Sequence, residues 1–201
     1  MRVEGGVIVG SNDKYQTRNP ISRKLIQGFD QSVSNCLALA NPSTVLEIGC
    51  GEGHITELIL AKDVSKVLAT DISVSLIREN ANRIKDLRVN FQTADIFSLS
   101  LKDQFDLIVC CEVLEHLSEP EEALDILFKL KANRYIFSVP REPIWRLMNM
   151  CRGAYLGKFG NSPGHIQHFS KSSFLKMVQN NFIIDHILTP LPWTVILCTP
   201  R

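Results

Sequence analysis

Residues 45–53 read Val-Leu-Glu-Ile-Gly-Cys-Gly-Glu-Gly, a short apolar run that ends in glycines at positions 49, 51 and 53. Glycine has no Cβ, so such a segment can turn sharply and let a ligand lie directly on its backbone. A glycine-rich turn between a first strand and the following helix is the usual cradle for a nucleotide-like ligand at the carboxyl edge of a parallel sheet. The stretch therefore predicts a strand, a ligand-binding turn and a helix in succession.

Strand and helix patterns alternate on both sides of this stretch. Upstream, apolar residues recur every three or four positions, which predicts a helix over residues 19–40 with Pro20 in its first turn. Its expected apolar face consists of Ile21, Leu25, Phe29, Val33 and Cys36. Besides a strand at 44–48, we expect strands at 66–70, 88–92, 105–110 and 135–139, and helices at 54–61, 75–86 and 120–130. Strands separated by helix-length segments indicate βαβ units and a parallel sheet.

The alternation breaks after Pro140. A connection as long as 141–169 inside a compact domain is more often a functional lid than a plain loop. A helix over 170–180 and strands over 183–188 and 193–199 follow, and we expect the two strands to form an antiparallel hairpin at the sheet edge.

The predicted architecture is a single α/β domain over 1–201 with a doubly wound, seven-stranded sheet that is mostly parallel and ends in an antiparallel hairpin. Its expected parts are a helix at 19–40, a ligand-binding core at 43–140, a substrate lid at 141–169, and a C-terminal helix and strand pair at 170–201.

The lid sequence leaves two interpretations open. Ile144, Leu147, Met148 and Cys151 fall on one helical face, and the segment carries four basic residues against the single acid Glu142. One interpretation is a helix packed over the active site with its arginines in solvent. The other is an interfacial lid that admits a lipidic or anionic substrate.

The composition says more about the cellular compartment of the protein than about its binding partners. A formal net charge of +1 gives no global field toward nucleic acid or membrane. None of the six cysteines forms a CxxC pair, which excludes zinc-finger and thioredoxin-type sites, and a reduced, cytoplasmic setting fits cysteines in apolar runs. No stretch approaches 18 apolar residues, so we expect no transmembrane segment. The N-terminal ten residues are too weakly apolar for a signal-peptide core.

Acidic residues follow three successive strands and narrow the choice of ligand. Asp71 ends the second strand, Asp95 the third, and Cys110-Cys111-Glu112 the fourth, so these groups converge on one crevice. A carboxylate at Asp71 can accept both hydroxyls of a ribose. The spacing is GxGxG rather than the GxGxxG typical of dinucleotide sites, and Glu47 would repel a pyrophosphate. Glu47 suits a ligand that carries an ammonium and a sulfonium, namely S-adenosylmethionine (SAM).

These residues resemble the class I SAM-dependent methyltransferases. VLEIGCGEG at 45–53, TDIS at 70–73, ADIF at 94–97 and FDLIVCCEVLEHL at 105–117 look like that family's motifs in order and spacing. The resemblance implies a Rossmann-like fold, SAM as cofactor and S-adenosylhomocysteine (SAH) as product. It implies that Asp71 binds the ribose, Asp95 the adenine, and the Cys110 backbone the amino-group end. The full implied cofactor set is Glu47, Gly49, Cys50, Gly51, Gly53, Asp71, Ile72, Asp95, Ile96, Cys110 and Cys111.

The acceptor site is expected around Glu112, Glu115 and His116, which would share one face if the segment were helical. His165 and His168 lie downstream. The pattern resembles ubiquinone-biosynthesis O-methyltransferases and small-RNA 3′-terminal 2′-O-methyltransferases. We expect His116 and His165 to be catalytic, as a metal-free base. The alternative is a divalent metal held by Glu112, Glu115, His116 and His165.

The functional prediction is SAM-dependent O-methylation of a small or lipid-like acceptor. An RNA 2′-O- or protein methyltransferase and a non-catalytic SAM-binding domain are the alternatives, and an RNA acceptor is disfavoured because the chain lacks an extended basic stripe. An NAD-dependent oxidoreductase is disfavoured by the glycine spacing. The identity of the acceptor, methylation at oxygen against nitrogen or carbon, and the oligomeric state are left open by the sequence.

Overall fold

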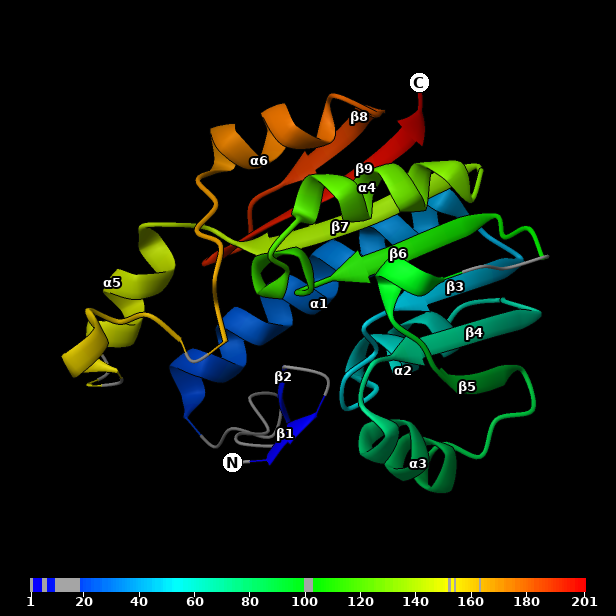
Figure 1. Ribbon diagram of the computed structural model, residues 1–201, viewed down its shortest axis with the longest axis horizontal. Coiled ribbons are helices and arrows are strands. Elements are labelled where there is room, and N and C mark those ends of the chain that lie inside the picture. The colour runs from blue at the N-terminus through cyan, green and yellow to red at the C-terminus, as the bar shows by residue number, and fades with distance from the viewer. Residues whose placement is uncertain are drawn as a thin grey trace.

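The computed structural model of the chain describes residues 2–4, 7–9, 19–99, 103–151, 153, 155–162 and 164–201. Its main feature is a seven-stranded sheet with helices on both faces (Figure 1). The strands are β3 (Thr44–Ile48), β4 (Lys66–Asp71), β5 (Val89–Thr93), β6 (Leu107–Cys111), β7 (Arg134–Pro140), β8 (Phe182–Leu188) and β9 (Trp193–Pro200).

The spatial order of the strands is β5-β4-β3-β6-β7-β9-β8. Strands β3 to β7 run parallel to their neighbours in this group, whereas β9 is antiparallel to both β7 and β8. The order reverses beside β3, which is where ligands bind in doubly wound sheets. The predicted α/β sheet with an antiparallel terminal hairpin is confirmed.

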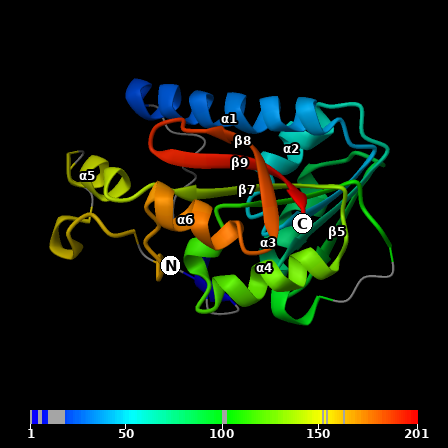
Figure 2. The same cartoon turned by 90° about the horizontal axis from the view of Figure 1, so that it is seen from above.

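Two layers of helices cover the sheet. Helices α1 (Pro20–Ala40) and α2 (His54–Leu60) lie on one side, and α4 (Pro120–Lys129) and α6 (Lys171–Val178) lie on the other (Figure 2). Helix α3 (Val74–Arg83) packs beside β4 and β5.

The central strands are apolar on both faces because each face meets a helical layer. Along β6, Leu107 and Val109 join the core cluster under α1 and α2, whereas Ile108 and Cys110 join the cluster under α4 and α6. Every residue of β6 is buried, as its nearly continuous apolar run predicts.

Helix α1 begins where the sequence predicts, because the Asn19 side chain accepts hydrogen bonds from the backbone N–H groups of Ile21 and Ser22. Its expected apolar face is partly wrong. Ile21 is 70% exposed, and Ile26 instead joins Phe29 in the core.

One helix end and one strand pair also differ from the sequence expectation. Helix α3 ends at Arg83 rather than at Asp86, because the Asp86 carboxylate accepts a hydrogen bond from the Arg88 N–H and forms a local turn. An antiparallel pair of short strands, β1 (Arg2–Glu4) and β2 (Val7–Val9), was not predicted. No helix in the described ranges is both long and apolar enough to cross a membrane.

The segment that follows β7 contains α5 (Ile144–Cys151) and the short 3-10 turn η4 (Leu156–Lys158), which lie beyond the end of β7 (Figure 1). The predicted apolar face of α5 is wrong in part. Leu147 is 56% exposed and Cys151 is exposed, whereas Asn149 is buried because its amide donates to the carbonyl oxygen of Gly160. A polar residue that is buried through a hydrogen bond does not appear in the pattern of apolar residues, so the sequence pattern could not predict that Asn149 is buried.

Candidate active site

The glycine turn after β3 has the backbone that its sequence predicts. Gly49, Gly51 and Gly53 all have positive φ, at 70°, 52° and 80°. A Cβ on Gly49 would collide with the side chain of Val113, whereas a Cβ on Gly51 would meet nothing within 4 Å. The absence of a Cβ at Gly49 therefore allows the loop after β6 to pack closely against the turn. At Gly51 the space directly over the backbone is open.

Asp71, the last residue of β4, is oriented by this turn. One carboxylate oxygen accepts a hydrogen bond from the Gly51 N–H at 2.9 Å, and the other accepts from the Ser73 N–H at 2.9 Å. The side chain is half-buried, and each carboxylate oxygen has a second acceptor position. Both oxygens are thus fixed in direction while keeping capacity for further donors.

Asp95 and its neighbours mark the same sheet edge at β5. The Asp95 carboxylate accepts from the Phe97 N–H at 3.0 Å and begins a 3-10 turn, η2 (Ile96–Ser98). Ile96 is buried and Ile72, which follows β4, is half-buried.

Glu47 lies on β3 beneath the glycine turn and is only 1% exposed. The Thr56 hydroxyl donates to its carboxylate at 2.6 Å. Burial raises the pKa of Glu47 to about 7, the Thr56 hydrogen bond lowers it, and the charge of Asp71 raises it. A carboxyl group that titrates near neutrality can respond strongly to a cationic ligand beside it.

The buried backbone around the turn is also held in place. Cys50 is buried, its N–H donates to the carbonyl oxygen of Thr70, and the Asn80 amide donates to the carbonyl oxygen of Gly51 at 2.7 Å. Gly53 is buried against Asn80 and Arg83 of α3. The predicted cofactor residues Cys110 and Cys111 are buried at the end of β6, next to β3.

This edge fits SAM. Bare backbone at Gly51 accommodates a closely bound ligand, the oriented Asp71 carboxylate suits a ribose diol, and the buried acid Glu47 suits a positively charged ligand.

The end of β6 departs from the sequence expectation. Glu112 has a φ of 60°, a left-handed conformation that costs a non-glycine residue roughly 1–3 kcal/mol. Only Leu114–His116 form a helical turn, the 3-10 turn η3. The expected shared face of Glu112 with Glu115 and His116 is therefore wrong.

The Glu112 carboxylate instead bonds toward β9 and β7. It accepts a hydrogen bond from Nε1 of Trp193 at 2.7 Å and from the hydroxyl of Ser138 at 3.3 Å.

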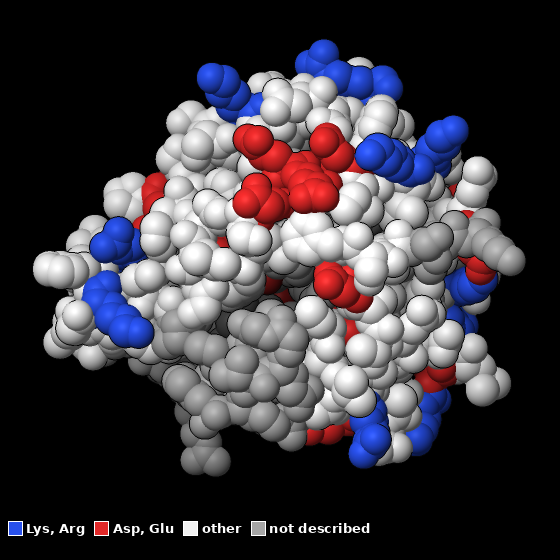
Figure 3. Space-filling view, in the orientation of Figure 1, with Lys and Arg blue, Asp and Glu red and all other residues white. Residues whose placement is uncertain are grey.

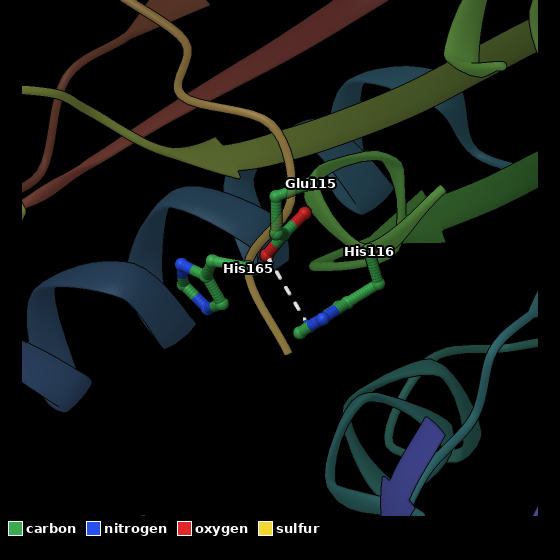
Figure 4. A group of neighbouring side chains, drawn as sticks. All are labelled: Glu115, His116 and His165. Carbon is green, nitrogen blue, oxygen red and sulfur yellow. Dashed lines mark ion pairs between the residues drawn. The ribbon is translucent and has the colours of Figure 1, made fainter. Parts of the chain in front are cut away.

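Glu115, His116 and His165 are brought together, and we call them the acid–imidazole cluster (Figure 4). One potential ligand atom from each lies within 4.8 Å of the others. The carboxylate of Glu115, a buried residue, is 4.0 Å from Nε2 of His116, and the two imidazole rings meet edge to face at 4.9 Å. Residues 49 positions apart in the sequence thus share one site.

The chain around His165 is tied to η3 by its backbone. The N–H groups of Ile166 and Gln167 both donate to the carbonyl oxygen of Glu115, at 2.9 and 3.0 Å. Nδ1 of His116 lies 2.9 Å from the carbonyl oxygen of Gly164. A carbonyl oxygen only accepts, so in this contact the proton is on Nδ1 and Nε2 is the acceptor atom of the neutral ring.

Sequence reasoning missed two tryptophans at this site and left His168 open. His168 lies apart from the cluster, with its Nδ1 3.7 Å from the carboxylate of Glu142. The indole of Trp145 stacks on the ring of His165 at 5.6 Å and meets Trp193 at 5.5 Å. These contacts depend on how α5 folds back toward β9, and no local pattern encodes them.

Comparisons with known proteins place this chain in a family. A family model for a methyltransferase domain matches residues 21–181. The malonyl-[acyl-carrier protein] O-methyltransferase of Priestia megaterium is 29% identical over 154 residues, which cover 73% of this chain and 54% of that protein. The ubiquinone biosynthesis O-methyltransferase of Coxiella burnetii is 40% identical over 83 residues, which cover 40% of this chain and 35% of that protein. The chain thus spans about a third to a half of the length of these relatives.

Solved structures agree with the fold. Magnesium protoporphyrin IX methyltransferase from Synechocystis PCC 6803, with bound SAH, superposes with a TM-score of 0.70 at 19% identity over 94% of this chain and 91% of that chain. The N-methyltransferase NodS from Bradyrhizobium japonicum, also with SAH, gives a TM-score of 0.70 at 20% identity over 95% of this chain and 94% of that chain. At these identities the likeness shows the fold alone.

The predicted resemblance to methyltransferases is confirmed, and the match over residues 21–181 shows that this chain belongs to the methyltransferase domain family.

Proposed function

We propose that the chain transfers the methyl group of SAM to an oxygen atom of a small or amphipathic acceptor. The observation that carries this proposal is the acid–imidazole cluster, which lies beside the glycine turn after β3. Val113, which packs against Gly49, precedes η3 by one residue, so the proton-accepting groups lie next to the proposed methyl donor site.

The cofactor roles follow from the donors and acceptors present. Asp71 would accept the ribose hydroxyls and Asp95 the adenine amine, while Glu47 would face the cationic methionine end. The backbone of Gly49, Cys50, Gly51 and Gly53, with Ile72, Ile96, Cys110 and Cys111, would complete the walls. Bound SAM supplies an electrophilic methyl group on its sulfonium.

The residues of the cluster would prepare the acceptor. Nε2 of His116 accepts the proton of an acceptor hydroxyl, and the carboxylate of Glu115 stabilises the imidazolium that forms. The imidazole of His165, which meets the His116 ring edge to face, offers a second proton-accepting nitrogen in the cluster. Holding the acceptor oxygen about 3 Å from the methyl carbon, and in line with it, contributes much of the rate.

Activation of the acceptor hydroxyl by a divalent metal is the alternative to a histidine base. One carboxylate and two imidazoles suit a first-row divalent ion, and the bond from Nδ1 of His116 to a backbone carbonyl is the usual support for a metal-binding histidine. Glu115, His116 and His165 would hold the ion, which would lower the pKa of a bound hydroxyl. Glu112 would not take part, because its carboxylate is directed to Trp193.

Residues 141–169 are proposed as the lid over the acceptor. Four of its large apolar side chains are exposed, namely Leu147 (56%), Leu156 (60%), Phe159 (73%) and Ile166 (60%). Such a surface favours a lipid-like or acyl-linked acceptor over a polar one. Two relatives are named for O-methylation of malonyl-[acyl-carrier protein] and in ubiquinone biosynthesis, which supports oxygen as the acceptor atom.

A nucleic-acid acceptor has less support. On the face of the molecule in Figure 3, acidic side chains gather over α4, and the described basic residues there form no continuous stripe. A reducing, cytoplasmic setting is supported by the six cysteines, all of them free thiols.

The proposal is tested by incubating the chain with methyl-labelled SAM and a panel of acceptors that includes short-chain and long-chain phenols, acyl thioesters and RNA. We expect label in an ether or ester of an amphipathic acceptor, and its loss in a His116→Ala, His165→Ala double variant. Label on RNA or protein alone, or SAM binding without turnover on any acceptor, would contradict the proposal.

A further inference from the structure

Glu112 and His165 are joined by a continuous path of side chains through two indoles. We call Glu112, Trp193, Trp145 and His165, in this order, the tryptophan bridge. It runs from the end of β6, across the start of β9, to α5 and then to the segment that carries His165.

The first half of the bridge is held by the buried indole of Trp193, and Glu112 beside it is half-buried. Trp193 is 4% exposed, and its indole packs on Phe29 of α1 with ring centroids 4.9 Å apart. Its Nε1 donates to the Glu112 carboxylate at 2.7 Å, a short hydrogen bond to a charged acceptor. Glu112 has a left-handed backbone conformation here, which persists where surrounding contacts impose it.

The second half of the bridge is Trp145, whose indole contacts both Trp193 and the imidazole of His165. Trp145 meets the Trp193 ring at 65° and stacks on the His165 ring at 26°. Ser162 ties both partners together, because its hydroxyl accepts from Nε1 of Trp145 at 2.9 Å and its carbonyl oxygen accepts from the N–H of His165 at 3.2 Å. The imidazole plane of His165 is therefore set by an indole whose own position is fixed at two points.

We propose that Glu112, Trp193 and Trp145 are positioning residues that orient the His165 imidazole toward His116. This inference rests on the proposed function for its consequence in catalysis. It gives Glu112 a role different from a metal ligand or a base, namely acceptance of the indole hydrogen bond that begins the bridge.

The first test needs no activity. Trp145 and Trp193 are the two tryptophans of the chain, so both indole N–H signals in a nitrogen-correlated NMR spectrum report on the bridge, and the ring signals of the five histidines include His165. Trp145→Phe, Trp193→Phe and His165→Gln assign these signals. We expect Glu112→Ala to shift the Trp193, Trp145 and His165 signals together. Glu112→Gln should shift chiefly Trp193, because an amide oxygen still accepts from its Nε1.

Glu121→Ala is the matched control, since Glu121 is an exposed acid on α4, and it should leave all three signals in place. Unchanged Trp145 and His165 signals in Glu112→Ala would overturn the inference.

The second test uses kinetics and non-additivity. Glu112→Ala and Trp145→Leu should each lower kcat by on the order of 10–100-fold through misplacement of His165, with little change in the KM for SAM. Glu112→Gln should recover most of this loss. In a His165→Ala background, Trp145→Leu should cost almost nothing further, because both changes remove the same interaction.

Equal losses from Trp145→Leu in the wild-type and His165→Ala backgrounds would contradict a positioning role. So would a Glu112→Gln variant as impaired as Glu112→Ala. If the Trp145→Leu variant does not fold, Trp145→Phe replaces it, because phenylalanine keeps a ring that can stack on His165. We expect a smaller loss of kcat in this variant. Failure of the wild-type chain to methylate any acceptor would defeat the proposed function, whereas the NMR test would still decide the bridge.

Discussion

Nδ1 of His116 and the carbonyl oxygen of Gly164 lie 2.9 Å apart, although they belong to segments separated by 48 residues. The contact fixes which nitrogen of His116 faces the cluster. It also joins the turn after β6 to the proposed lid. The position of the lid segment around Gly164 and the orientation of the His116 imidazole therefore depend on one another.

Gly164 is therefore a sensitive position. Its φ is 87°, and an added Cβ would lie 3.3 Å from Nδ1 of His116. We expect Gly164→Ala to displace the imidazole and lower kcat by about 10-fold or more while SAM affinity stays nearly unchanged. Steady-state kinetics and SAM calorimetry on the same variant provide the measurement. Weaker SAM binding with an intact kcat would contradict this coupling.

Chelation separates the two versions of acceptor activation. If a histidine is the base, a chelator leaves activity unchanged, and activity falls at acid pH because a protonated imidazole cannot accept the proton of the hydroxyl. If Glu115, His116 and His165 hold a metal, a chelator abolishes activity and Mg²⁺ or Mn²⁺ restores it. Full activity of both His116→Ala and His165→Ala in the presence of chelator would contradict both versions.

Glu47 makes stability depend on pH. Burial raises its pKa from 4.5 to about 7, so the folded chain holds a proton that the unfolded chain releases. Its contribution to stability is fully present below about pH 4.5 and is lost as the pH rises to about 7, by roughly 3 kcal/mol. We expect the difference in melting temperature between wild type and Glu47→Gln to change across this window. A constant difference from pH 4 to pH 8 would contradict the assignment.

Three glycines provide a matched set. Gly51→Ala places a methyl group in open space where the ligand would lie, so it should weaken SAM binding and cost about 1–2 kcal/mol for its positive φ. Gly49→Ala should destabilise the fold more, because it collides with Val113. Gly28→Ala, in the interior of α1, should stabilise by about 0.5–1 kcal/mol and leave SAM affinity unchanged. Chemical denaturation and calorimetry distinguish the three outcomes, and unaltered SAM affinity in Gly51→Ala would be the contrary result.

The fold could be predicted because its central strands obey simple physical rules. A strand such as β6 is buried on both faces and so reads as a continuous apolar run, and parallel strands end at one edge, which brings Asp71 and Asp95 to the same side as the glycine turn. Boundaries were less predictable where a side chain competes with the backbone, as Asp86 does at the end of α3.

The acceptor site could be predicted only in part. His116 and His165 were expected to meet, and they do. The spacing of Glu112, Glu115 and His116 predicts a shared face if the segment is helical, but a left-handed residue at Glu112 turns its carboxylate toward Trp193. A single backbone angle of this kind has no signature in a periodic pattern. The stacking of Trp145 on His165 is a tertiary contact with no local signal.

The most direct measurement of the central claim is calorimetric titration of the chain with SAM. We expect one SAM bound per chain, and in Asp71→Ala a loss of two charge-assisted hydrogen bonds worth about 1.5–3 kcal/mol each. Asp103→Ala, which removes an exposed acid paired with Lys66 at the start of β4, should bind SAM like wild type. Tight binding of NAD with no binding of SAM, or SAM affinity unchanged in Asp71→Ala, would contradict the account.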